Sequence, residues 1–386
     1  MNISKPDYKG GSIVNLMSSI SKAYNTNHPY PALKTLSPSE IKKAKNVVLL
    51  VIDGLGFEYL KTRKDSFLYK NMKSTMTSVF PPTTGAAIPT FLTGVPPQQH
   101  ASTGWYVYLK ELGVVSAILP FTPRVGGVPF THLGISVESI ISQKPLSEKL
   151  NTKVFHVTRK EIHDSDFTVA MAKKAKILSY SSLNGFFRQI KKAVSWNKKK
   201  KYVFGYWDSL DSLNHKQGEG SAKANKHFNE IDKKLKKFSE SLKETNTLLV
   251  ITSDHGFINI PKEKRLWLED HPELKKTLSM PLSGEPRAAY CYVRPGREKE
   301  FEGYVKKHLS RYCYMVKTET AIKQNYFGLY NPNSKLFERA GDYILLMKEN
   351  YIFKDKIAKK KKKEFVAHHG GVSRNEMIVP LIIINC

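Results

Sequence analysis

The sequence predicts an α/β protein: a central, mainly parallel sheet flanked by helices, with a small α+β insert late in the chain. Apolar runs typical of buried strands alternate with helical patterns, which is the usual order in a parallel sheet. Two of these runs, 47–52 and 247–253, have no polar alternation, so both of their faces should be covered. Between residues 257 and 365 the alternation breaks, and short strands surround a single helix.

The first predicted element is a helix over 12–24, where Ile13, Leu16 and Ile20 recur at helical spacing behind Ser12 as a candidate N-cap. Helices are also expected over 165–196 and 221–244. The expected strands of the sheet cover 47–52, 114–119, 153–158, 202–207, 247–253 and 377–384. In the insert we expect strands over 288–293 and 312–318 and a helix over 298–309.

These elements predict a core formed by residues 1–256 and 366–386, and an insert formed by residues 257–365. The insert leaves the sheet directly after Asp254 and His255, and it returns directly before His368 and His369. Because it begins and ends beside polar residues, it is suited to be a cap or lid over a site. A decorative surface insertion is the structural alternative.

The composition suggests a chain that attracts anions. Its 386 residues include 62 Lys plus Arg and 34 Asp plus Glu, which gives a net charge of +28. Such a charge favours nucleotides, nucleic acid or anionic lipid as partners. The lysine runs 198–201 and 359–363 have no interleaved aromatic residues, however, so they indicate solvated loops rather than a specific nucleic-acid reader.

The chain shows no sign of a disulfide framework or a membrane segment. Its three cysteines form no CxxC pair, which argues against a zinc knuckle and fits a reducing compartment. No apolar signal segment opens the sequence, and no run of about 18 apolar residues occurs. We therefore expect no transmembrane span and a cytoplasmic location, and no feature specifies an oligomeric state.

Polar residues stand where predicted strands end, which is where open α/β sheets bind ligands. Asp53 ends the first strand before a glycine, and Asp254 and His255 follow the strand over 247–253. An Asp-Gly pair also suits a plain tight turn, but a buried aspartate needs a cation or a metal ion. Thr83 and Thr84 open a short helix after a proline-rich turn, where they could simply cap the helix or could meet an anion.

A second group of possible ligands lies further along the chain. Asp211 and His215 are four residues apart, so a helix would place both on one face toward one ion. Asp208 stands three residues earlier and is interpreted as a helix cap or a supporting group. His368 and His369 precede two glycines, which let the backbone approach a ligand closely.

These residues together predict two divalent metal ions. Three carboxylates, three imidazoles and a hydroxyl suit a pair of zinc-like ions better than Mg²⁺ bound by carboxylates alone, although Mn²⁺ or Mg²⁺ stays compatible. Two neighbouring ions suit in-line displacement at phosphorus, and a threonine hydroxyl at a helix start is a suitable phosphoryl acceptor. Each residue taken alone has an ordinary structural role, so the prediction depends on their combination.

Five segments in this order resemble the alkaline phosphatase superfamily, most closely its nucleotide pyrophosphatase/phosphodiesterase branch. The segments extend over roughly five-sixths of the chain and read VVLLVIDGLG, SVFPPTTGAAIPTFLTGVPPQQH, DSLDSLNHKQG, VITSDHGF and HHGGVSRNEMIVPLI. The resemblance implies an alkaline phosphatase-like fold and a threonine nucleophile. Thr84 is preferred over Thr83 because its distance to Thr93 and Gly94 matches the spacing in the family.

The resemblance also implies how the metal ligands are shared. One ion would be held by Asp53, Thr84, Asp254 and His255, and the other by Asp211, His215 and His369. The threonine points to phosphate esters, because related sulfatases have a modified cysteine or serine there. One position departs from the branch: Ala87 stands where an asparagine would donate to a phosphoryl oxygen, so backbone N–H groups or another side chain must replace it.

The sequence therefore predicts a metal-dependent phosphoric ester hydrolase, a phosphodiesterase or nucleotide pyrophosphatase acting on a small anionic substrate such as a nucleotide. A phosphomonoesterase or phosphonate hydrolase on the same metal pair is the nearest alternative. A transferase would suit the chemistry but would normally be anchored to a membrane. A polyanion-binding protein with structural metals is a further alternative, against which Thr84 argues, since a structural zinc site has no use for that hydroxyl.

Overall fold

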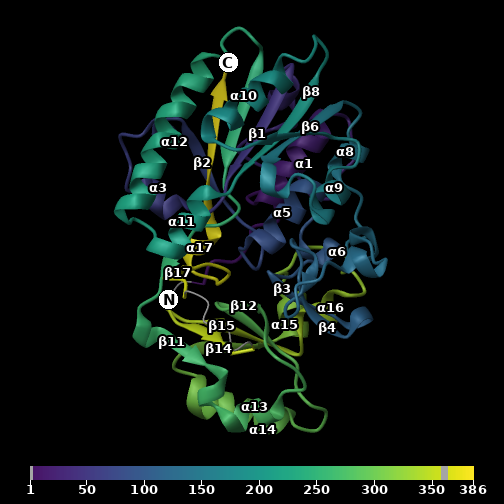
Figure 1. The fold of residues 1–386 in the computed structure, drawn as a ribbon, viewed down its shortest axis with the longest axis vertical. Coiled ribbons are helices and arrows are strands. Elements are labelled where there is room, and N and C mark those ends of the chain that lie inside the picture. The colour runs from purple at the N-terminus through teal and green to yellow at the C-terminus, as the bar shows by residue number, and fades with distance from the viewer. Residues whose placement is uncertain (1–2, 358–363) are drawn as a thin grey trace.

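The computed structural model describes residues 3–357 and 364–386, and its two main sheets belong to a larger and a smaller body (Figure 1). The larger body, with the sheet called the larger sheet below, fills the upper part of the view, and the smaller body lies below it. Two separate two-stranded sheets are formed by β10 (Ile258–Asn259) with β17 (Ala367–His368) and by β11 (Arg265–Trp267) with β16 (Ile352–Lys354). The predicted lysine loop at 359–363 lies outside the described residues.

The larger sheet has seven strands in the described part of the chain, in the order β2-β18-β9-β1-β8-β6-β7. Strand β1 pairs in parallel with both β8 and β9, and β6 continues the parallel arrangement from β8 to β7. Only β18 runs against its neighbours, β9 and β2. The strands are β1 (Asn46–Ile52), β2 (Met72–Thr77), β6 (Lys153–Arg159), β7 (Lys176–Tyr180), β8 (Lys201–Trp207), β9 (Thr247–Thr252) and β18 (Ile378–Asn385).

Helices cover both faces of this sheet, which confirms the predicted fold class. All seven residues of β1 are buried, and alternate side chains point to opposite faces. Val47, Leu49 and Val51 pack in one cluster with helices α1 and α5, while Val48 and Leu50 pack in another with α10 and α12. The helices of this body are α1 (Ile13–Ala23), α2 (Pro38–Lys42), α3 (Phe57–Lys61), α4 (Phe67–Lys70), α5 (Thr84–Thr93), α6 (Pro97–His100), α7 (Val137–Ile140), α8 (Leu146–Lys149), α9 (Asp166–Ala172), α10 (Leu183–Val194), α11 (Ser209–Gln217), α12 (Ala222–Glu240) and α17 (Arg374–Met377).

The smaller sheet combines the insert with an earlier segment of the chain. Its order among the described residues is β14-β15-β13-β12-β3-β4-β5, and its strands are β3 (Tyr106–Leu109), β4 (Val114–Ala117), β5 (Thr122–Pro123), β12 (Ser283–Glu285), β13 (Ala288–Cys291), β14 (Cys313–Lys317) and β15 (Tyr343–Met347). Its helices are α13 (Pro272–Thr277), α14 (Glu298–Tyr304), α15 (Thr318–Lys323) and α16 (Leu336–Ala340). The strand expected at 114–119 therefore belongs to this sheet, and the sheets do not follow the predicted boundary at residue 256.

Several local predictions are wrong in detail. The stretch 165–196, expected to be mostly helical, contains strand β7 between α9 and α10, and β2 was not expected. The helix expected over 298–309 is α14 followed by a π-helical turn at Val305–Leu309. Lys201, expected in a solvated loop, starts β8 fully buried, because its Nζ donates to Asn46 Oδ1 and to the carbonyl of Val194 at the end of α10.

Across residues 3–357 and 364–386, no helix combines the length and apolar character needed to cross a bilayer.

Candidate active site

The predicted site residues come from five separate places and meet at one end of the larger sheet. Because β1 lies between β8 and β9 in parallel register, the carboxyl ends of these three strands open onto the same edge. The residue after β1, the second and third residues after β9, helix α11 after β8, the start of α5 and the residue after β17 all reach this edge. They bring together Asp53, Thr84, Asp211, His215, Asp254, His255 and His369.

The first group surrounds the Nε2 atom of His255. This nitrogen lies 3.3 Å from Asp53 Oδ1, 3.3 Å from Asp254 Oδ2 and 3.2 Å from the hydroxyl of Thr84. The Thr84 hydroxyl is also 3.5 Å from Asp53 Oδ2. His255 Nδ1 lies 3.1 Å from the carbonyl of Gly256 and must donate to it, so Nε2 carries the lone pair that a metal ion needs.

The second group lies against the first. His215 Nε2 is 3.5 Å from Asp211 Oδ1 and 3.1 Å from His369 Nε2, and His369 Nε2 is 3.9 Å from Asp211 Oδ1. His215 Nδ1 donates to the carbonyl of Ala367 at 2.9 Å, which again leaves Nε2 free to bind a cation. The rings of His255 and His369 stack with centroids 3.7 Å apart, so the two groups share a wall.

The donor atoms fit metal ions because they lack other partners. Among the described residues, the buried atoms Asp53 Oδ1, Asp211 Oδ1 and Asp254 Oδ2 have no hydrogen-bond partner. Ligand atoms of Asp53, Asp254 and His255 lie within 4.8 Å of one another, as do those of Asp211, His255 and His369. Unpaired buried carboxylates cost several kcal/mol, which a cation would offset. Oxygen and imidazole donors in this number suit zinc-like ions.

The pKa values of the site's carboxyl and imidazole groups also indicate a metal site. Burial, followed by the charge of Asp254, raises the pKa of both Asp53 and Asp211 well above the usual carboxyl range. Burial lowers the pKa of His215 to about 4, and it lowers the pKa of His255 and His369 too. Neutral imidazoles beside carboxylates that resist ionisation are the state expected of a metal site without its cation.

Each carboxylate of the first group is held by one oxygen and leaves the other free. The hydroxyl of Tyr206, in β8, donates to Asp53 Oδ2. The backbone N–H groups of Gly54 and His255 donate to Asp254 Oδ1 at 3.2 and 3.0 Å. Tyr206 was missed by the sequence reasoning, although its place one residue before the end of a strand next to β1 could have suggested it.

Thr84 is the first residue of α5, as expected, and the hydroxyl of the preceding residue, Thr83, donates to Glu285 of the smaller sheet. The N–H groups of Ala86 and Ala87 bond to the carbonyl of Thr83 at 3.0 and 2.8 Å. The N–H groups of Thr84 and Gly85 have no protein partner in the described part of the chain, so they are available to an anion. Ala87 is fully buried in the core and its side chain offers no donor.

Two contacts from the smaller sheet were not predictable from local sequence. Glu285, in β12, accepts from Thr83 Oγ1 at 2.7 Å and from the N–H of Trp105 at 2.6 Å, and burial raises its pKa to about 7. Arg287 forms a fully buried, two-bond ion pair with Glu376, which also accepts from the N–H of Gly371 at 2.7 Å. These contacts hold Thr83, which precedes Thr84, and Gly371, which lies two residues after His369.

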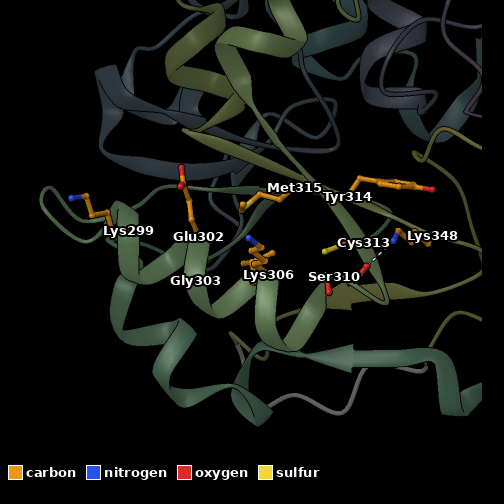
Figure 2. A pocket seen from close by; sticks show the side chains of 10 residues that line it. Lys299, Glu302, Gly303, Lys306, Ser310, Cys313, Tyr314, Met315 and Lys348 are labelled. Carbon is orange, nitrogen blue, oxygen red and sulfur yellow. Dashed lines mark hydrogen bonds between the residues drawn. The ribbon is translucent and has the colours of Figure 1, made fainter.

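Asp208 and His368, which the sequence analysis named without assigning them as metal ligands, lie beside the site. Asp208 precedes α11 and its carboxylate pairs with Arg159 at 3.0 Å. His368 is buried next to His215, with ring centroids 5.9 Å apart. A hollow of about 500 Å³ lies elsewhere, between α14 and β14 of the smaller body (Figure 2). Its lining contains none of the predicted site residues. The candidate active site is therefore the first and second groups of side chains described above.

A family model described as type I phosphodiesterase / nucleotide pyrophosphatase matches residues 47–372, a span that includes every predicted site residue. Similar solved structures include murine ectonucleotide pyrophosphatase / phosphodiesterase 5, which is 17% identical with 87% of each chain covered and a TM-score of 0.64. An inactive threonine-to-alanine form of the murine protein, in complex with AMP, is 18% identical with 87% of each chain covered and a TM-score of 0.62.

Phosphonoacetate hydrolase from Sinorhizobium meliloti, in complex with phosphonoformate, is 17% identical, with 88% of this chain and 90% of that chain covered and a TM-score of 0.61. These likenesses describe a shared fold. A search of curated proteins finds no match.

Proposed function

We propose that this chain, which belongs to the type I phosphodiesterase / nucleotide pyrophosphatase family, cleaves small anionic substrates such as nucleotides with Thr84 as the nucleophile. Family membership makes the chain a metal-dependent phosphoric ester hydrolase, and the predicted family and enzyme class are confirmed. The observation that carries the choice of Thr84 is its position: a hydroxyl at the start of a helix, 3.2 Å from His255 Nε2 within a cluster of unpartnered metal-donor atoms.

The residues fit two divalent cations, for which we propose zinc. Asp53, Thr84, Asp254 and His255 would hold one ion, and Asp211, His215 and His369 would hold the other. When bound, the ions would lower the pKa of the nucleophilic hydroxyl and neutralise charge on the leaving oxygen. The similar murine structure supports the role of threonine, because its threonine-to-alanine form is described as inactive.

The chain's own groups would position and stabilise the reacting phosphoryl group. The Thr84 hydroxyl attacks phosphorus in line, the bond to the leaving oxygen breaks, and water later cleaves the phosphothreonine. The free N–H groups of Thr84 and Gly85, at the positive end of α5, would meet a non-bridging oxygen. They would thereby supply the donor that Ala87 lacks.

We propose that the insert over 257–365, joined by the strands over 106–123, forms a cap on the remainder of the core formed by residues 1–256 and 366–386. Glu285 supports this proposal, since it bonds from the smaller sheet to Thr83, the neighbour of the nucleophile. Arg287 supports it too, because its pair with Glu376 binds the smaller sheet to the segment after His369. A cap held at these points would control what reaches Thr84.

A phosphonate hydrolase on the same metal pair is a second candidate. Two observations favour it: the likeness to phosphonoacetate hydrolase, and Ala87 in place of the asparagine expected in the diesterase branch. A phosphonate presents the same phosphoryl oxygens, so the same residues would act on it.

Two chromogenic phosphate esters and one phosphonate distinguish a phosphodiesterase from a phosphomonoesterase and a phosphonate hydrolase. Zinc-loaded protein should cleave bis(p-nitrophenyl) phosphate faster than p-nitrophenyl phosphate or phosphonoacetate, and a chelator should stop the reaction. Thr84→Ala should abolish turnover while the metal content, measured by atomic emission, stays near that of the parent. Thr83→Ala, which removes a neighbouring hydroxyl bonded to Glu285, should keep measurable activity. Normal turnover by Thr84→Ala would show that the nucleophile is another group.

A further inference from the structure

Strand β14 forms one end of the smaller sheet and has an open edge. In the part of the chain that the structure describes, it pairs with β15 and with no other strand. The N–H of Lys348 donates to the carbonyl of Tyr312 at 2.8 Å, and such bonds recur at every second residue of an antiparallel pair. The backbone of Tyr314 therefore points to β15, whereas the N–H and carbonyl of Met315 point away from the sheet.

One side of a helix runs beside this open edge. Four residues recur at intervals of three or four through α14 and the π-helical turn that follows it: Lys299, Gly303, Lys306 and Ser310. This spacing places them on the same side of the helix, and all four line the hollow of about 500 Å³ between α14 and β14 (Figure 2). Single π-helical turns occur often at functional sites.

The floor of the hollow is apolar and has room for a side chain. Val305 and Cys313 are buried, and Met315 packs against the same hydrophobic cluster. Gly303 contributes no side chain, and a Cβ atom at this position would have no neighbouring atom within 4 Å. The space is therefore open from the helix side as well as along the strand.

The rim of the hollow is basic. Three lysines line it: Lys299, Lys306 and Lys348. The one carboxylate in the lining, that of Glu302, already accepts from the Tyr343 hydroxyl at 2.7 Å and pairs with Lys317 at 3.0 Å. Figure 2 shows Lys348 at the other end of the hollow, where its Nζ donates to the carbonyl of Ser310 at 2.6 Å and keeps further N–H donors. An anionic partner would gain at this rim.

We propose that the hollow binds an extended acidic segment of another protein, which adds a strand to the open edge of β14. The N–H and carbonyl of Met315 would bond to the backbone of the segment, its apolar side chains would enter the hollow, and its carboxylates would meet the lysines. A second copy of this chain fits less well, because it carries a net charge of +28 and brings the same lysines. The inference does not depend on the proposed function, since the lining contains no predicted site residue.

Fluorescence anisotropy with three labelled seven-residue peptides tests the proposal. The first peptide alternates glutamate and valine, the second alternates lysine and valine, and the third is the first with its central valine replaced by proline. The acidic peptide should bind, and the other two should bind at least about 10-fold more weakly, because one reverses the charge and the other interrupts the strand. Binding of the acidic peptide should weaken as the salt concentration rises.

Two variants locate the binding. Gly303→Leu fills the hollow from a position with no neighbour within 4 Å, and leucine suits a helix better than glycine. Met315→Pro removes the N–H that points away from the sheet and keeps the bonds between β14 and β15. Each should weaken binding of the acidic peptide about 10-fold while the melting temperature stays near that of the parent.

Gly303→Ala is the matched control, because it adds one methyl group and leaves most of the hollow open; it should bind the peptide like the parent. If Met315→Pro does not fold, Gly303→Leu decides alone. The proposal would be overturned if the parent does not bind the acidic peptide, or if Gly303→Leu binds it as tightly as Gly303→Ala. Sedimentation of the parent as a dimer that Gly303→Leu dissociates would also overturn it, because the occupant would then be a second copy.

Discussion

Tyr206→Phe removes a single hydroxyl that holds a proposed metal ligand, Asp53, in place. The Tyr206 hydroxyl donates to Asp53 Oδ2, while Asp53 Oδ1 has no partner among the described residues and faces His255 Nε2 at 3.3 Å. The ring of Phe fills the same space, so the change deletes the hydrogen bond and little else. Without it, the Asp53 carboxylate can rotate away from the orientation that presents Oδ1 to an ion.

The expected loss is moderate and specific to metal binding. Removing the partner that orients a ligand typically lowers metal affinity about 10- to 100-fold. This corresponds to about 1.4 to 2.7 kcal/mol, which is the range for a hydrogen bond to a charged group. The free energy of unfolding of the metal-free protein should change less, because Asp53 resists ionisation there and its pKa is raised chiefly by burial.

Competition with a chromophoric chelator measures the zinc affinity of the parent and the variant. Tyr180→Phe is the matched control: it deletes the same kind of hydroxyl in β7, two strands from β8 in the sheet, where it donates to the backbone carbonyl of Tyr206 at 2.6 Å. We expect weaker binding of one zinc ion in Tyr206→Phe and unchanged binding in Tyr180→Phe. Equal zinc affinity in Tyr206→Phe and the parent would refute the claim that Asp53 is a ligand oriented by this bond.

Two further predictions concern stability. In metal-free protein the raised pKa values of Asp53 and Asp211 mean that the folded chain keeps protons which the unfolded chain releases, and above about pH 7.5, one unit above the ordinary histidine pKa, the site histidines are neutral in both states. Chelator-treated protein should therefore become less stable in thermal melts as the pH rises from about 7.5, and zinc should remove this slope; a slope that zinc leaves intact would contradict it. Arg287→Leu should cost about 3 to 5 kcal/mol in urea unfolding, because it leaves Glu376 charged and buried, whereas Arg297→Leu, at an exposed ion pair, should cost under about 1 kcal/mol; similar losses would argue against the buried pair.

The residues at strand ends could be predicted because their signal is local. Asp53 directly follows an apolar strand, and Asp211 and His215 have the spacing of one helix face, so residue type and position sufficed to propose them. The structure brings these side chains together with Thr84 and His369. Their roles as ligands and nucleophile stay predictions that the experiments above test.

The contacts that support the site could not be predicted in the same way. Tyr206, Glu285 and Arg287 act on residues far away in sequence, and nothing in their own neighbourhoods distinguishes them from ordinary core positions. Strand β7 was missed because it is short and lies at the sheet edge between two helices. The joining of 106–123 to the insert depends on pairing between β3 and β12, which no local pattern encodes.

An anomalous-scattering map of zinc-soaked crystals tests the central claim most directly. It should show two peaks, one among Asp53, Thr84, Asp254 and His255 and the other among Asp211, His215 and His369. A map with no peak there, or with a single ion away from Thr84, would contradict a two-metal hydrolase that uses this threonine.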